Sequence, residues 1–302
     1  MTGRAARGAR ISSSVLRDLL DVLVDATRGA VRLRVEGRSS APGALPAWLS
    51  CAAQFDFIGV GEGSTALLIE APQLVDIAPG LFQQRDLFHP FHGDCTALDL
   101  LEDSIDEASR GQLDTDLYDQ GLLSTLRNFD RVLRSGYEAM EFGDVARPRP
   151  VIVGRETVDQ MDRLLRATPP PQAARISGKL DTIRHSDRMF TLLLEDGQSL
   201  KGVAEGIATE KLAELFGSIV LVTGRAVFRP SGRILRLDAD GVEGAGDGRA
   251  VWSTVPMPLF DSLDGAALRR PQGPRSGVNA IIGRWPGDED DATFAGALEA
   301  LS

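Results

Sequence analysis

The pattern that most constrains the fold of this chain lies between residues 173 and 243. Five segments there have the composition of β-strands: ARISGKLDTIRHSD, RMFTLLLEDG, QSLKGVAEG, SIVLVTGRAVF and GRILRLDADGV. Between the third and the fourth lies TEKLAELFG, a short helical segment for which Thr209 is the expected N-cap and Gly217 the expected stop. A helix in this place belongs to the chain order of an OB-type barrel. The sequence therefore predicts a five-stranded OB-like barrel at 173–243, with another small five-stranded barrel as the alternative.

The chain before the barrel is predicted to begin with a helix. Three serines that can each act as its N-cap precede a set of apolar residues at helical spacing: Ser12, Ser13 and Ser14, then Val15, Leu19, Leu20 and Leu23. The segment AVRLRV either extends this helix or begins a strand, because its periodicity fits both.

Two further helices and two short strands are expected between residues 96 and 154. Thr96 can cap a helix that runs through about Arg110. A second helix is expected from Asp114 to Ser135, with an apolar stripe of Leu122, Leu126, Phe129 and Leu133. YEAMEF and RPVIVG are typical of short strands.

The elements and the composition together predict an α+β protein built of five segments. Pro169, Pro170 and Pro171 end a connecting helix, and after Gly244 the chain becomes rich in Gly, Pro, Arg and Ser. The predicted segments are a mixed α+β domain at 1–154, a connecting helix and proline linker at 155–172, the OB-like barrel at 173–243, a flexible linker at 244–275 and an acidic partner-binding tail with a short helix at 276–302.

The stretch GVGEGST, from Gly59 to Thr65, has the composition of a phosphate-binding loop. A Walker loop needs a lysine before its hydroxyl residue and a helix directly after it, but Gly63 occupies the lysine position and the β-rich TALLIEAP follows. The same glycines suit a tight turn between two strands, because glycine accepts positive φ angles. We therefore predict a β-hairpin here.

Composition narrows the class of protein. Of the 302 residues, 43% are hydrophobic and 25% charged, as in an ordinary globular protein, and no apolar run approaches the roughly 18 residues that a membrane span needs. Two cysteines and a charged early segment, ISSSVLRDLLDVLVD, favour a reducing, cytoplasmic location over secretion. The net charge of −10 disfavours sequence-independent binding of nucleic acid by the whole chain and suits a basic partner.

Neither a metal site nor a catalytic site is predicted. His89, His92, Asp94 and Cys95 lie close together, but no second ligand pair completes a tetrahedral zinc site, since Cys51 and His185 are isolated. Asp114, Asp116 and Asp119 fit an EF-hand loop poorly, because the glycine and the final glutamate are missing. They are interpreted instead as the negatively charged first turn of a helix. We expect no enzyme activity and no cofactor.

Arg225, Arg229 and Arg233 surround the turn between the last two predicted strands. OB folds use the loop at this place to contact oligonucleotides, which makes single-stranded nucleic acid an alternative ligand. Ten basic and ten acidic residues in 173–243 leave no net positive charge, and Phe190, Phe216 and Phe228 are needed for the core. A role in protein contact is therefore preferred.

The last residues form the most distinctive motif. Trp285, Pro286 and Gly287 are followed by four acidic residues, from Asp288 and Glu289 onward, and then by an apolar stripe at helical spacing: Phe294, Leu298 and Leu301. Aromatic anchors of this kind are enriched at interface hot spots, and so short a helix needs a surface on which to fold. That surface is either the chain's own domains or a groove on another protein, and the long linker favours the second.

The segment GRWPGDEDDATFAGALEALS resembles the C-terminal tails of bacterial antitoxins whose partners are PIN-domain ribonuclease toxins. FRPSGRILRLDAD and GKLDTIRHSDRMFTLLLEDG also resemble a poorly characterised bacterial family that we associate with such toxin genes. The resemblance implies that the chain neutralises a PIN-domain ribonuclease, with Asp288 and Glu289 facing basic groups at its RNA-binding surface. Most antitoxins of this kind are short and carry a small DNA-binding module, which this large acidic body does not match.

Overall fold

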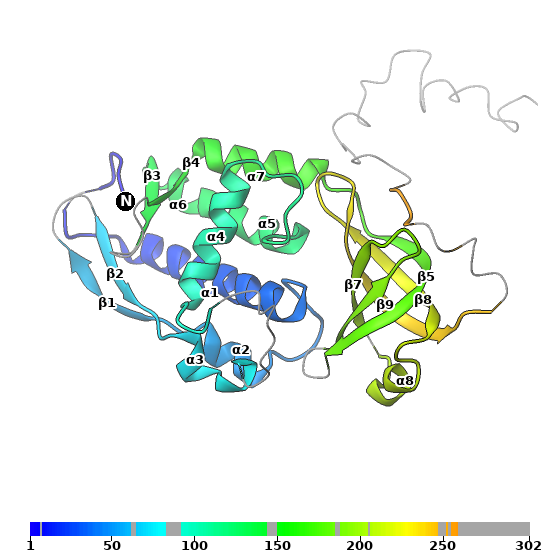
Figure 1. The fold of residues 1–302 in the computed structure, drawn as a ribbon. Coiled ribbons are helices and arrows are strands. Elements are labelled where there is room, and N and C mark those ends of the chain that lie inside the picture. Colours follow the sequence, from blue (N-terminus) through cyan, green and yellow to red (C-terminus); the bar gives the residue numbers. More distant parts are fainter. Residues whose placement is uncertain are drawn as a thin grey trace, which may run out of the picture. The chain divides into compact units, whose positions relative to one another are not determined.

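The computed structural model describes residues 1–6, 8–61, 65–82, 92–143, 150–184, 188–204, 206–246, 252 and 255–258. The chain divides into two units, Met1–Ser262 and Leu263–Ser302, and every described residue belongs to the first. Its described residues form two separate hydrophobic cores, one among helices and one inside a closed barrel. The predicted α+β fold class with an OB-like barrel is confirmed (Figure 1).

Helix α1 (Ser13–Glu36) is the centre of the first core. Ser12 is its N-cap and accepts a hydrogen bond from the Val15 amide at 3.4 Å. AVRLRV continues the helix, and Gly37 ends it in the left-handed conformation with a φ of 71°. The apolar stripe predicted from Val15 is buried apart from Leu20, which is half-buried.

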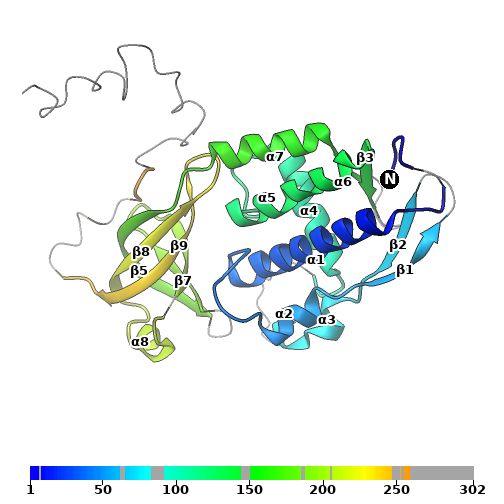
Figure 2. The same ribbon diagram turned by 180° about the vertical axis from the view of Figure 1, so that it is seen from behind.

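Most of the other helices before the barrel pack against α1, as Figures 1 and 2 show from opposite sides. Their bounds are α2 (Ala47–Ala52), α3 (Leu74–Ile77), α4 (Ala97–Ser109), α5 (Gln120–Leu126), α6 (Asp130–Arg134) and α7 (Arg155–Ala167), with 3-10 turns η1 (Pro79–Phe82) and η2 (Arg127–Phe129). Thr96 caps α4 as predicted, in a capping box with Asp99. Helix α7 adds Val158, Met161 and Leu164 to the same core as α1.

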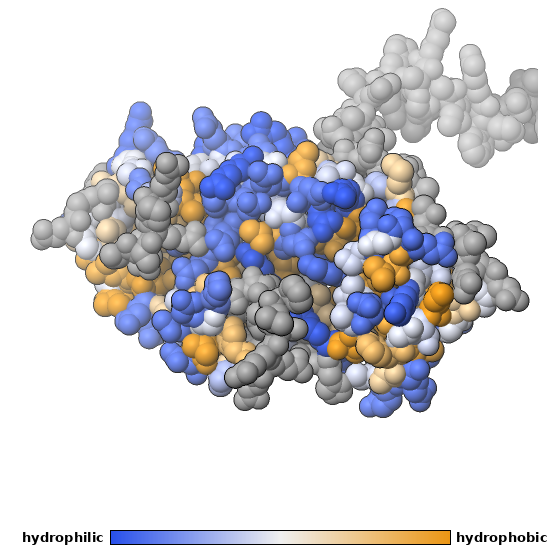
Figure 3. All heavy atoms as spheres, in the orientation of Figure 1, coloured by the Kyte–Doolittle hydropathy of each residue, from blue (hydrophilic) through white to orange (hydrophobic). Residues whose placement is uncertain are grey.

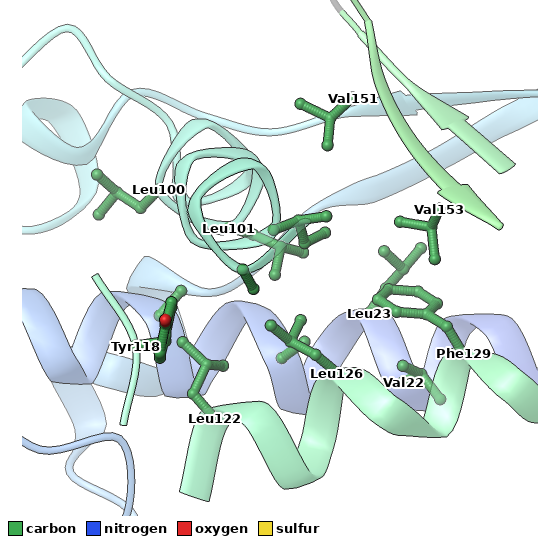
Figure 4. Packing of buried hydrophobic residues seen from close by; sticks show 14 of the residues in the cluster. Val22, Leu23, Leu100, Leu101, Tyr118, Leu122, Leu126, Phe129, Val151 and Val153 are labelled. Atoms are coloured by element: carbon green, nitrogen blue, oxygen red, sulfur yellow. The ribbon is translucent and has the colours of Figure 1, made fainter. Parts of the chain in front are cut away.

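The single helix predicted from Asp114 to Ser135 is wrong at its start and in its continuity. The helix begins at Gln120, because the Asp119 side chain caps it by accepting from the Leu122 amide at 2.9 Å. A 3-10 turn then separates α5 from α6. The predicted apolar stripe is nevertheless buried throughout. Leu126 and Phe129 point toward the part of α1 that carries Val22 and Leu23 (Figure 4), whereas Leu122 packs near Gly29 of the same helix.

Two antiparallel strand pairs complete the N-terminal part; the first was predicted as a hairpin, and the strands of the second were predicted without their pairing. Strands β1 (Asp56–Gly61) and β2 (Ala66–Glu70) pair antiparallel, so GVGEGST does join two strands, although its residues 62–64 lie outside the described part of the chain. Strands β3 (Ala139–Phe142) and β4 (Val151–Gly154) also pair antiparallel.

The barrel has the predicted chain order. Its elements are β5 (Gln172–Arg184), β6 (Met189–Leu193), β7 (Ser199–Ala204), α8 (Thr209–Glu214), β8 (Ile219–Phe228) and β9 (Ile234–Gly244). The sheet closes in the order β5-β6-β7-β9-β8, and β7 with β9 is the parallel pair. Thr209 is the first helical residue rather than the N-cap, which is Ala208, and Gly217 lies beyond the helix end with a φ of 75°.

Close packing inside the barrel depends on Gly202. Its strand partner Phe190 points into the barrel core, and a Cβ atom on Gly202 would overlap the Phe190 ring. Glycine therefore makes room for this aromatic ring in the core.

The residues described after β9 contact the barrel at separate places. The Ala245 amide donates to the Ile219 carbonyl at 3.0 Å, at the start of β8. Trp252 then lies 5.8 Å from the guanidinium carbon of Arg175, and Val255 packs against the barrel core. A Cβ atom on Gly232 would lie 3.5 Å from Pro258, at the turn that follows β8. The described residues of this segment, 245–246, 252 and 255–258, are called the C-terminal arm below, and they contact the barrel near the start of β8, at Arg175 and near the turn that follows β8.

Candidate functional site

The residues predicted to bind a partner fall in the second unit of the chain, outside the described residues. They are Trp285, Pro286, Gly287, Asp288, Glu289, Phe294, Leu298 and Leu301. Their role stays a prediction from sequence.

Within the described residues, the densest cluster of charged groups joins the acidic loop, residues 113–119, to the barrel. Asp116 pairs with Arg229 and, at 2.6 Å, with Lys201 of β7. Asp114 pairs with Arg233 and lies 3.5 Å from Arg229. Each carboxylate thus bridges two basic side chains.

Backbone contacts fix the same junction. The Ser231 amide donates to the Leu113 carbonyl at 3.2 Å, and Arg229 Nε donates to the Thr115 carbonyl at 3.3 Å. A second guanidinium nitrogen of Arg229 donates to the Ile234 carbonyl. Arg229 therefore holds the β8–β9 turn, residues 229–233, against the acidic loop.

The electrostatics of Asp116 follow from this geometry. Burial alone would raise the pKa of the Asp116 carboxyl, but hydrogen bonds and charges from Lys201 and Arg229 outweigh it and lower the pKa. The carboxylate is ionised at neutral pH and attracts both cations.

Asp119 makes the buried part of the junction. Its carboxylate accepts from the Ser39 amide at 3.1 Å and from Arg236 Nη1 of β9 at 3.1 Å, in addition to capping α5. Arg236 also donates to Asp238 at 2.8 Å. These polar groups are almost fully enclosed, and each of the three has a hydrogen-bond partner.

The end of α1 adds contacts with the neighbouring strands. Arg184 of β5 donates to the Val35 carbonyl at 3.2 Å, and a Cβ atom on Gly37 would lie 3.0 Å from Met189 of β6. Val203 of β7 lies against the same glycine. An outward side of the barrel that includes parts of β6, β7 and β9 is therefore covered by the chain's own N-terminal part.

The structure places the three arginines of the predicted nucleic-acid site in different surroundings. Arg229 is 17% exposed and engaged as described, while Arg233 is 68% exposed and paired with Asp114. Arg225 lies exposed on β8, opposite Ala173 and Asp238 in the sheet register.

Asp114 and Asp116 do not form the first turn of a helix as predicted, because α5 starts after them. Their pairing with the barrel arginines was not predicted. The only signal in the sequence is the opposite charge of two short segments more than a hundred residues apart, and many other pairs of segments share it.

Of the residues considered for a metal site, His89 and His185 lie outside the described residues. Across the described ranges, no group of three or more His, Cys, Asp or Glu side chains is placed to hold a metal ion. Burial raises the pKa of the Cys95 thiol, so this cysteine is not activated as a thiolate.

A small hollow lies between α1, the following loop and α5. It encloses about 220 Å³ and is lined by Arg28, Arg32, Ser39 and Leu45, among others. Arg32 pairs with Glu36 at 2.7 Å, so its charge is compensated within the chain. The hollow brings together no acid–base pair suited to catalysis.

One apolar surface lies on the β1–β2 hairpin. Phe57, Ile58 and Leu68 are exposed there, and Figure 3 shows hydrophobic residues gathered over this region of the face in view. Among the described residues, no helix is both long and apolar enough to cross a membrane.

Comparison with protein-family models, with curated proteins and with solved structures finds no match to this chain. The fold and the geometry above therefore carry the functional argument together with the sequence motifs.

Proposed function

We propose that the protein is an antitoxin-like inhibitor that binds a PIN-domain ribonuclease through its tail, residues 276–302. The observation that carries this proposal is the order of groups in the tail: an aromatic anchor at Trp285, an acidic turn from Asp288, and an apolar stripe that ends at Leu301. The resemblance of this order to antitoxin tails indicates the kind of partner.

Inhibition would combine steric and electrostatic effects. Trp285 enters an apolar pocket of the ribonuclease, as central aromatic residues do at many interfaces. Asp288 and Glu289 compete with RNA for basic groups, and the chain's net charge of −10 favours association with a basic surface. Phe294, Leu298 and Leu301 lie in a groove of the partner as one face of a short helix.

The described body supports the proposal through its own organisation. The carboxylates of the acidic loop are already paired with barrel residues, so they are not the free acidic surface that would meet a basic partner.

The test is whether the chain binds and inhibits a PIN-domain ribonuclease. The intact chain, a chain that ends at Arg275 and the Trp285→Ala variant are compared in pull-down and RNA-cleavage assays. We expect the truncated chain to lose both activities and Trp285→Ala to weaken binding by about 2 kcal/mol or more.

A matched control is Trp252→Ala, which removes a tryptophan from the arm rather than from the tail. Equal capture of the ribonuclease by the intact and truncated chains would assign binding to the folded body. Unchanged binding by Trp285→Ala alone would remove the anchor from the mechanism.

A further inference from the structure

We propose that Arg229, Arg233 and Lys201 form a phosphate-binding edge for single-stranded nucleic acid, and that the chain's own acidic loop occupies this edge and keeps it closed. The inference goes beyond the proposed function, because it concerns the barrel and does not depend on the tail.

The first step is the position of the basic groups. The β8–β9 turn is the loop between the fourth and fifth barrel strands, the loop with which OB folds contact oligonucleotides. Lys201 reaches the same place from β7, and its side chain is 54% exposed. Three cations from two separate parts of the barrel thus converge at one edge.

The second step is what they bind. Asp114 and Asp116 are two anionic groups on one short, irregular stretch of chain, and each bridges two of the three cations. Successive phosphates of a single strand also present anionic oxygens along an extended backbone. The acidic loop therefore occupies the edge as a substitute for a nucleic-acid backbone.

The third step is that the loop can open without loss of the whole junction. The pairs of Asp114 and Asp116 are partly exposed, so salt and a competing polyanion weaken them. Asp119 is buried and bound to Arg236, which keeps the end of the loop in place. Opening is confined to residues 113–117.

The experiment compares the full-length chain with the double variant Asp114→Asn/Asp116→Asn. Binding of a fluorescein-labelled oligothymidylate of about 20 nucleotides is followed by anisotropy at about 50 mM salt. We expect the double variant to bind at least about tenfold more tightly than the unmodified chain. If three phosphates are neutralised, its affinity should fall roughly twentyfold between about 50 and 200 mM salt.

Two controls locate the effect. Glu156→Gln/Asp159→Asn removes the same charge from exposed positions of α7 and should leave the affinity unchanged. Adding Arg233→Glu to the double variant should abolish the gain, because it reverses one of the three cations.

A folded double variant that binds no better than the unmodified chain, or no better than the α7 control, would overturn the proposal. So would a gain that persists with Arg233→Glu. If the double variant does not fold, the single variant Asp114→Asn, which leaves the Asp116 pairs intact, replaces it. This variant should bind the oligonucleotide about threefold more tightly than the unmodified chain. Unchanged affinity of the folded single variant would also overturn the proposal.

Discussion

Asp119 at the start of α5 and Arg236 on β9 form a buried ion pair at 3.1 Å, although 117 residues separate them in the chain. Asp119 also caps α5 and holds Ser39, so one carboxylate connects the end of the α1 region, α5 and the barrel. Without the Asp119 carboxylate, Arg236 keeps its ion pair with Asp238 and loses the one with Asp119.

Asp119→Ala should lower the free energy of unfolding by roughly 3–5 kcal/mol, because removing one partner leaves a buried charge poorly compensated. Asp119→Asn should cost less, since asparagine retains the capping role. Urea unfolding measures both. The control is Asp106→Ala, which breaks the more exposed pair with Arg110 and should change stability by no more than about 0.5 kcal/mol. Equal losses for Asp119→Ala and Asp106→Ala would contradict the stabilising role of the buried Asp119–Arg236 pair.

Asp116 should make stability depend on pH. Its folded pKa lies below the unfolded value of about 3.9, so its ionised form stabilises the fold at higher pH. This stabilisation is lost as pH falls through the folded pKa. In thermal melts between about pH 7 and pH 3, the unmodified chain should have a higher melting temperature than Asp116→Asn at neutral pH. The difference between the two melting temperatures should shrink as the pH falls. A difference that stays constant with pH would mean that the charge of Asp116 is not what stabilises the junction.

Gly202→Ala should destabilise the barrel by about 1–3 kcal/mol, because the added methyl group collides with the Phe190 ring. Replacing Phe190 by Leu in the same chain should recover part of this loss. Gly246→Ala, where the new Cβ meets open space, is the control for the change in composition. Denaturant unfolding of the three variants measures these free energies of unfolding. If Phe190→Leu lowered the stability of Gly202→Ala further, overpacking would not be the cause of the loss.

Arg175→Ala should loosen the C-terminal arm with little effect on the barrel, because the contact with Trp252 contributes only about 0.5–1 kcal/mol. Backbone order parameters at Val255 and Met257 should fall from about 0.85, a rigid value, toward about 0.6. Lys179→Ala, exposed on the same strand, should leave them unchanged. Identical order parameters in both variants would show that Arg175 does not hold the arm.

Local signals in the sequence predicted much of the fold. The barrel order followed from strand composition around one short helix, and Thr96 was recognisable as a cap because a threonine side chain can accept from the first amides of a helix. The hairpin at GVGEGST followed from the element types on either side of its glycines.

Relationships between distant segments could not be predicted. The segment AVRLRV is helical because Ala30, Val31 and Leu33 are buried in the helical core, and tertiary packing overrides a periodicity that also suits a strand. Asp114 and Asp116 resemble a helix start by composition, but their partners are contributed by the barrel. The tail motif, by contrast, is visible in sequence alone.

The junction between the acidic loop and the barrel has a consequence for synthesis on the ribosome. At roughly 5–20 residues per second, the chain takes roughly six to twenty-three seconds to extend from Asp119 to Arg236. During that interval the nascent helical part has Asp114, Asp116 and Asp119 without their barrel partners. Completion of β9 is therefore the step at which the earlier half of the protein reaches its final electrostatic state.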